Sequence, residues 1–320
     1  MRRKVDLQND LHVFEGNTLT LGGEEQRESM HETTFSDFQG FVVNGTTNAQ
    51  ATTRAGYVQD QFKLFERFTG TIGGRIDDHS RFGQHETGLV TGAYRHLETD
   101  TKIAASYGSG FRAPALFELF GFTANNFGGT FNGNPALKPE TSKSWDAGFE
   151  QTLFDRRVTF GATYFHNDIA NLIVCDINTC NNVSNAETFG AESFVRFDVT
   201  RDLNVNTSYT YTRAFDATTG EDLLRRPKNK ADTRVTWFPF GGAELTVGVS
   251  YTGSQRDVTV DGGNDYPGGY TLVNLAAAYR PVDHVKLYLR LDNVLDRRYE
   301  VADGFRGPGV GGFAGIATEF

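Results

Sequence analysis

The sequence offers few side chains that could perform chemistry, and the first of these form an acidic cluster with a histidine. Asp77, Asp78 and His79 are consecutive, and carboxylate and imidazole groups bind metal ions. The seven histidines are scattered, and none forms a spaced pair with a cysteine or another histidine. A solvated tight loop therefore explains residues 77–79 better than a metal site, and the sequence leaves the identity of any metal unknown.

Glycine-rich and serine motifs are the next candidates for an enzyme. The segment 307–312, Gly-Pro-Gly-Val-Gly-Gly, matches the letters of a dinucleotide-binding loop, but it precedes an expected terminal strand and not a helix. The sequence also contains no Gly-x-Ser-x-Gly nucleophile elbow. These motifs therefore predict neither a cofactor nor an enzyme.

The two cysteines, Cys175 and Cys180, lie close together in a polar stretch. A disulfide between them would require an oxidising compartment. Spacing alone cannot show whether the geometry allows the bond, so a disulfide and two free thiols remain equal alternatives.

Composition limits the remaining function classes. The net charge of −9 argues against a nucleic-acid partner, which would need a basic face. No run of about 18 apolar residues is present, so we expect no membrane-spanning helix. A spanning β-barrel would show no such run either, because its strands alternate lipid-facing apolar residues with polar residues facing the lumen. The 36 glycines, 27 phenylalanines and 12 tyrosines suit glycine-rich strands and aromatic girdles.

Alternation with a two-residue period indicates the elements that carry these side chains. In 203–211 and 243–251 the odd positions are mainly apolar or aromatic and the even positions mainly polar. Side chains two apart share one face of a strand, so we expect the odd positions to face lipid. Charged side chains on the other face are expected to line the interior: Lys286, Arg290, Glu192, Arg196, Asp232 and Arg234.

The connections between these strands alternate between short and long, which is typical of outer-membrane barrels with tight periplasmic turns and longer external loops. Long loops are expected at about 29–49, 79–85, 111–140, 171–184, 215–225, 255–267 and 294–312. About fifteen antiparallel strands are expected, at 4–14, 17–28, 50–65, 67–78, 86–97, 100–110, 142–154, 157–170, 186–199, 202–214, 227–238, 243–254, 269–280, 284–293 and 313–320.

An odd number of strands has a consequence for closure. The two edges of such a sheet run in the same direction, and an antiparallel barrel cannot close through them without a parallel seam. Open edges in lipid leave backbone groups unsatisfied at a cost of several kcal/mol each. We therefore expect a missing N-terminal part with an odd number of strands, which would also account for the lack of a signal peptide after Met1.

Several segments occur in the order found in a known family. The segment 107–120, Tyr-Gly-Ser-Gly-Phe-Arg-Ala-Pro-Ala-Leu-Phe-Glu-Leu-Phe, precedes 133–141, Gly-Asn-Pro-Ala-Leu-Lys-Pro-Glu-Thr. The segment 291–300, Leu-Asp-Asn-Val-Leu-Asp-Arg-Arg-Tyr-Glu, precedes a terminal strand that ends on Phe320. Over essentially its whole length the sequence resembles TonB-dependent outer-membrane receptors, with the cobalamin receptor branch nearest and catecholate siderophore receptors similar.

This resemblance implies a barrel of 22 strands filled by an N-terminal plug. Residues 1–320 would be a partial barrel domain with strands 8–22, without the plug and the first strands. The implied function is TonB-energised uptake of cobalamin or a ferric siderophore, which this fragment would not perform alone. The implied partners are the TonB complex through the missing plug, outer-membrane lipid and the barrel assembly machinery. The implied location is the outer membrane of a Gram-negative bacterium.

The expected external loop 111–140 supplies the candidate ligand-binding residues, Arg112, Phe127, Asn132 and Asn134. For Arg112 an ion pair with a lumen carboxylate is the favoured alternative to ligand binding. Haem receptors of the family carry a histidine between the two motifs of this loop, and none is present here, so haem is disfavoured. The resemblance also assigns Phe320 as a C-terminal assembly signal.

Two other functions remain as alternatives. A passive porin-like or structural barrel would share the strand pattern but would lack a plug. A soluble all-β carbohydrate-acting enzyme would need Leu287, Leu289, Val205 and Val247 to point into a closed core, and two carboxylates in a groove.

Overall fold

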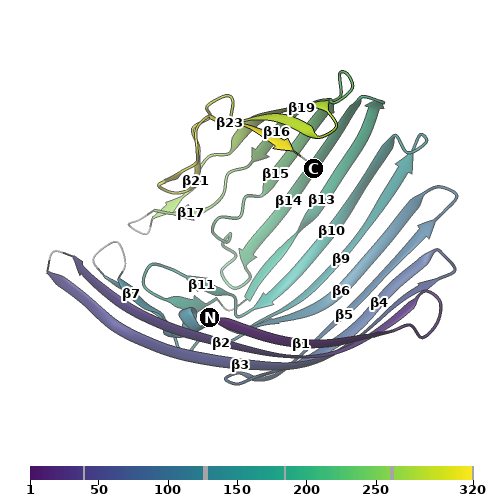
Figure 1. Ribbon diagram of the computed structural model, residues 1–320. Helices are drawn as coiled ribbons and strands as arrows, with labels where there is room; N and C mark the ends of the chain where they lie inside the picture. Colours follow the sequence, from purple (N-terminus) through teal and green to yellow (C-terminus); the bar gives the residue numbers. More distant parts are fainter. Residues whose placement is uncertain (39, 125–128, 184, 260–262, 319–320) are drawn as a thin grey trace.

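A single antiparallel sheet forms a strongly curved wall, with the remaining short elements gathered at one end (Figure 1). The computed structural model describes residues 1–38, 40–124, 129–183, 185–259 and 263–318. The sheet has 15 strands in the order of the chain. They are β1 (Arg2–Leu11), β2 (Asn17–Phe38), β3 (Phe41–Leu64), β4 (Phe68–His79), β5 (Gly83–His96), β6 (Thr101–Arg112), β9 (Glu140–Leu153), β10 (Val158–Ala170), β13 (Asn185–Thr200), β14 (Leu203–Asp216), β15 (Asn229–Trp237), β16 (Ala243–Thr252), β19 (Tyr270–Val282), β20 (Val285–Asp292) and β23 (Gly311–Thr318).

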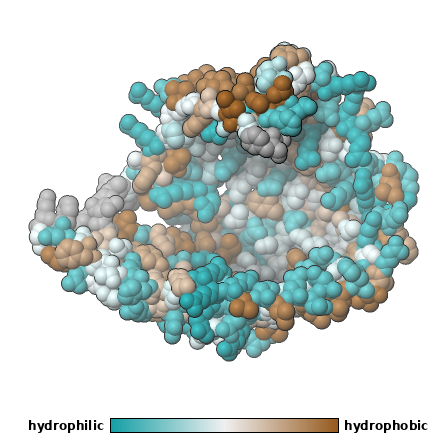
Figure 2. Space-filling view, in the orientation of Figure 1, coloured by the Kyte–Doolittle hydropathy of each residue, from teal (hydrophilic) through white to brown (hydrophobic). Residues whose placement is uncertain are grey.

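The predicted alternation is confirmed along these strands. On β16 the odd positions Leu245 and Val247 are 41% exposed on the outer face, whereas Glu244 and Thr246 line a concavity on the inner face. Figure 2 shows the wall hollowed on one side, with hydrophobic patches along its outer rim. Five charges expected inside line this concavity or the adjoining one, namely Arg196, Asp232, Arg234, Arg290 and Lys286.

The described part of the wall does not enclose an apolar core. Leu287 and Leu289 on β20 are 40% and 45% exposed, so they do not point into the closed core that the soluble all-β alternative requires. The largest fully buried side chains of the described residues, Leu119, Cys180 and Asp257, all lie in the long connections. Packing is therefore concentrated at the end of the wall where the long connections gather.

The short turns lie together at the opposite end of the wall. Phe65 and Glu66, between β3 and β4, have φ of 51° and 58°, as a hairpin turn with two left-handed residues requires. Such turns match the right-handed twist of the flanking strands, so they keep the strands paired up to their ends. Among the described residues, no helix is both long and apolar enough to cross a membrane.

One expected external loop is replaced by regular structure. Residues 29–49 were expected to form a loop, but β2 and β3 stay paired from Asn17↔Phe62 to Phe38↔Phe41. The resulting hairpin extends well past the neighbouring strands (Figure 1). Other long connections contain short elements: the helix α1 (Leu116–Phe120) and the strands β7 (Phe122–Ala124), β8 (Thr130–Asn132), β11 (Ile173–Cys175), β12 (Cys180–Asn182), β17 (Asp257–Val258), β18 (Asn264–Asp265), β21 (Glu300–Ala302) and β22 (Phe305–Arg306).

Candidate functional site

Two long connections pack together into a small folded unit at the end of the wall. We call their described parts, residues 113–124, 129–139 and 171–183, the cap. Its buried apolar cluster joins the first connection to the second, because Leu119, Phe131 and Leu137 pack with Cys180. Removing these side chains from water contributes roughly 25 cal/mol for each Å² of apolar surface. The cap therefore holds its shape through a core of its own.

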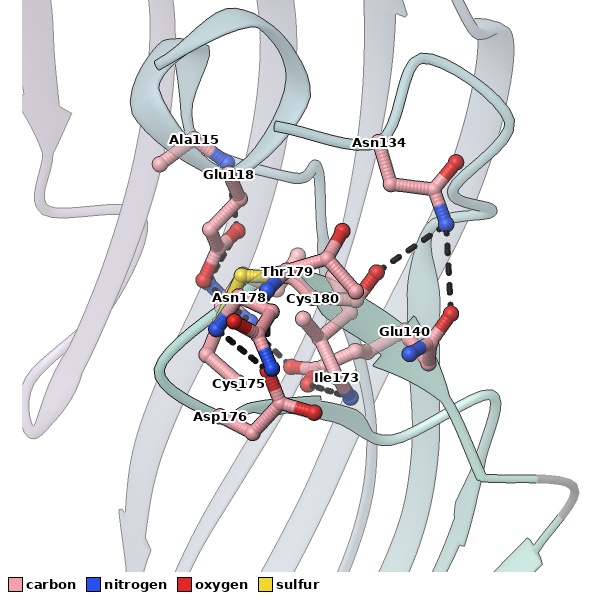
Figure 3. Close-up of a disulfide and its surroundings, with 12 residues drawn as sticks. Ala115, Glu118, Asn134, Glu140, Ile173, Cys175, Asp176, Asn178, Thr179 and Cys180 are labelled. Carbon is pink, nitrogen blue, oxygen red and sulfur yellow. Dashed lines mark hydrogen bonds and ion pairs between the residues drawn. A yellow bond between two sulfur atoms is a disulfide. The ribbon is translucent and has the colours of Figure 1, made fainter. Parts of the chain in front are cut away.

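A disulfide closes a hairpin within the second connection, and asparagine hydrogen bonds fasten this connection to the first (Figure 3). Cys175 and Cys180 form a disulfide, with their sulfur atoms 2.02 Å apart. Asn134 Nδ2 donates to the carbonyl oxygen of Cys180 at 3.0 Å. Asn182 Oδ1 accepts from the backbone N–H of Lys138 at 2.8 Å, and its Nδ2 donates to the Lys138 carbonyl oxygen at 3.0 Å.

Reduction of this disulfide is expected to loosen the β11–β12 hairpin without unfolding the wall. The bond closes a loop with a sequence separation of 5, for which chain entropy gives about 2 kcal/mol of local stability. Amide hydrogen exchange with and without dithiothreitol measures this effect, with faster exchange expected at Asp176 and Val183, whose N–H groups donate to the carbonyl oxygens of Thr179 and Leu172. Unchanged exchange at these amides would show that the cap core alone holds the hairpin.

Arg112 lies at the base of the cap and is neutralised by two carboxylates. Its Nε is 2.5 Å from Glu140 Oε2, and its Nη1 is 3.2 Å from Glu118 Oε1. Glu140 Oε1 also accepts the backbone N–H of Ile173 at 2.7 Å. Arg112 therefore ties α1 and β9 together, as the ion-pair alternative predicted, although its side chain stays 47% exposed.

The β2–β3 hairpin supports the cap from the side. Thr34 Oγ1 donates to the carbonyl oxygen of Phe122 at 2.5 Å, and Val43 on the same face is only 4% exposed. Gly45 leaves the space that the Phe122 ring occupies, because a Cβ at this position would lie 2.7 Å from that ring. Sequence reasoning missed this support, since the expected loop carried no signal for the pairing.

A cavity of about 610 Å³ lies between the cap and the inner face of the wall. Its lining combines ion-paired charges with apolar groups, and includes Glu24, Arg75, Asp77, Arg81, Phe111 and Leu119. Arg75 pairs with Asp77 at 2.8 Å and with Glu24 at 3.2 Å. Such a mixture can contact a ligand that has both charged and ring-shaped parts.

The interpretation of residues 77–79 as a solvated loop is wrong. They end β4, and Asp77 and His79 are 8% and 7% exposed. His79 Nδ1 accepts the backbone N–H groups of Arg81 and Phe82 at 3.2 and 3.3 Å, which in a neutral ring places the proton on Nε2. No group of three potential metal ligands occurs in the described part of the chain.

The remaining sequence-predicted residues occupy separate places. Asn132 ends β8 with an exposed side chain that donates to Thr130 Oγ1 at 3.0 Å. Asn134 lies inside the joint between the two connections. Phe127 and Phe320 fall outside the described residues. Sequence reasoning missed Glu118 and Glu140 as the ion-pair partners of Arg112. Their presence in the two segments 107–120 and 133–141 was the signal that could have indicated them.

The fold and the cap together define a class of protein. A curved antiparallel wall with an apolar outer face, a polar inner face, short turns at one end and long connections at the other is the wall of an outer-membrane β-barrel. The family described as TonB dependent receptor-like, beta-barrel, matches residues 2–294. The chain therefore belongs to this family, and it is located in the cell outer membrane of a Gram-negative bacterium.

Known relatives agree with this assignment. The iron-regulated outer membrane virulence protein of Vibrio cholerae is 26% identical over 310 residues, covering 89% of this chain and 46% of the relative. The siderophore receptor PirA from Acinetobacter baumannii has a TM-score of 0.80 at 17% identity, covering all of this chain and 54% of that one. The copper transporter OprC has a TM-score of 0.81 at 17% identity, covering all of this chain and 56% of that one. The chain thus spans about half the length of these relatives.

Proposed function

We propose that the whole protein is an outer-membrane receptor that takes up a ferric siderophore with energy supplied through TonB. Residues 1–320 would be part of its barrel domain. The observation that carries the proposal is the family match across residues 2–294. An iron-regulated relative and a siderophore receptor of the same fold support iron as the cargo. We propose a role in binding and transport, without catalysis.

The ligand itself is a finer proposal. The fold is shared with a copper transporter, so a fold alone does not select a siderophore over another metal chelate such as cobalamin. The cap offers polar groups at its surface, and we propose that Arg112, Asn132 and Asn134 belong to the ligand-facing side. The partly exposed guanidinium of Arg112 and the exposed amide of Asn132 support this assignment, whereas Asn134 is already engaged with Cys180.

Uptake by iron-limited cells tests the proposal. The full-length gene is expressed in a strain without its own siderophore receptors, and accumulation of radioactive iron from ferric enterobactin is measured. Uptake is expected in the presence of TonB and should be lost in a strain that lacks it, because the receptor has no energy source of its own.

A parallel measurement with radioactive cyanocobalamin separates the two ligand classes. Uptake of cyanocobalamin alone would replace the siderophore with cobalamin while keeping the receptor. Uptake of either compound that persists without TonB would support the passive porin-like alternative and overturn the proposal.

A further inference from the structure

Asp257 is a fully buried carboxylate that takes no part in the cap. It begins β17, in the connection between β16 and β19, and its exposed fraction is 0%. Burial of a charged carboxylate is costly unless hydrogen bonds and an opposite charge replace water. The contacts of Asp257 therefore indicate what this charge is for.

Three donors surround the carboxylate, and they come from three different connections. Arg225 Nε, in the connection between β14 and β15, is 3.0 Å from Oδ1. The backbone N–H of Val258, in the same connection as Asp257, is 2.9 Å from Oδ1. The backbone N–H of Asp303, between β21 and β22, is 2.8 Å from Oδ2. One side chain thus joins three connections that follow one another around the wall.

The neighbouring residues repeat the same linkage. The backbone N–H of Arg225 donates to the carbonyl oxygen of Arg256 at 2.8 Å, and Arg256 Nη1 donates to the carbonyl oxygen of Asp222 at 2.9 Å. Gln255 Nε2 donates to the carbonyl oxygen of Val301 at 2.9 Å. Arg225 also adopts a left-handed backbone with φ of 58°, which is unfavourable for a residue with a Cβ and persists only where the surroundings hold it.

Electrostatics keep the Asp257 carboxylate charged. Burial raises its pKa, but the backbone N–H groups of Asp303 and Val258 and the guanidinium of Arg225 together outweigh burial, so the pKa lies below its ordinary value. The carboxylate is therefore ionised at neutral pH and accepts all three hydrogen bonds at once. An amide could not do so, because one of its two polar atoms is a donor.

We propose that Asp257 is a positioning residue that couples three connections, in their described parts 217–228, 253–259 with 263–269, and 293–310, into one preformed unit at the external end of the receptor. The role in ligand capture rests on the proposed function, whereas the coupling itself does not. A coupled unit meets a ligand without first ordering three separate loops, which lowers the entropic cost of binding.

Distances measured by pulsed electron–electron double resonance on the ligand-free full-length receptor test the coupling. Spin labels are placed at Thr218, Tyr266 and Phe305, one exposed position in each connection. The unmodified receptor should give narrow distance distributions for the pairs 218–305 and 266–305. Asp257→Ala should broaden both of them. Arg225→Gln should broaden only the pair 218–305, because the contacts to Val258 and Asp303 remain.

A matched control removes a neighbouring carboxylate but keeps the three hydrogen bonds of Asp257. Asp303 contacts Asp257 through its backbone N–H, so Asp303→Asn should keep both distributions narrow. Equal broadening in Asp303→Asn, or narrow distributions in Asp257→Ala, would overturn the positioning role of Asp257. Narrow distributions in Asp257→Ala would show that the hydrogen bonds of Arg256 and Gln255 hold the connections without it. The Arg225 side chain is 52% exposed, so the Arg225→Gln receptor is expected to fold. This variant therefore tests the proposal a second time if the Asp257→Ala receptor does not assemble. A receptor that shows the coupling but takes up no siderophore would contradict only the proposed function.

Discussion

Replacing Ile72 with arginine is expected to destabilise the assembled barrel by about 2–4 kcal/mol, because a cation on the lipid face near the bilayer midplane has no water or partner. Ile72 lies in the middle of β4 and is 55% exposed on the outer face of the wall. Urea-induced unfolding of the full-length receptor in phospholipid vesicles measures the free energy of unfolding.

The matched control is Thr71→Arg, one residue away. Thr71 lines a concavity on the inner face, where a charged side chain stays in a polar environment. Its effect on the free energy of unfolding should be small beside that of Ile72→Arg. An equal decrease in the free energy of unfolding in the two variants would mean that both faces of the wall contact the same solvent. The assignment of the outer face to lipid would then be wrong.

Replacing Leu119 with alanine is expected to open the cap. Leu119 is 1% exposed and packs with Phe131, Leu137 and Cys180. A fully buried leucine replaced by alanine typically costs about 2–5 kcal/mol, through lost burial and the cavity left behind. Because the cap has its own core, hydrogen exchange should accelerate at amides within the cap, such as Gly133 and Asn134, while amides in β14 and β15 keep their protection.

Leu295→Ala is the control for this change. Leu295 is 69% exposed in another long connection, so the same chemical substitution should leave cap exchange unaltered. If Leu119→Ala instead accelerates exchange throughout the wall, the cap and the wall unfold together and the cap is not a separate unit.

The wall could be predicted from the sequence because a membrane imposes a simple rule on each strand. Lipid on one side and water on the other force alternation, as in 203–211 and 243–251, and the structure places the fifteen strands at the expected segments. Turn residues mark where each strand ends. The prediction therefore rests on local patterns that need no knowledge of which strands lie together.

The parts beyond the membrane could not be predicted in this way. Residues 29–38 and 41–49 are mostly polar on both faces, so no alternation reveals that they continue β2 and β3. The contact between Leu119 and Cys180 joins residues far apart in the sequence, and no local pattern reports it. In the sequence, Asp257 is indistinguishable from other acidic residues in polar loops. Its hydrogen bonds come from Arg225 and Asp303, which belong to other connections, so no local pattern predicts them.

The extended β2–β3 hairpin sets a limit on how the external end can change during evolution. Thr34 contacts the cap, and Gly45 leaves room for the Phe122 ring, only because both positions fall on the correct side of a two-residue period. Inserting or deleting one residue in either arm, between the wall and these positions, would turn them to the opposite side. Homologous hairpins are therefore expected to differ in length by even numbers of residues per arm, or to compensate an odd change with a bulge.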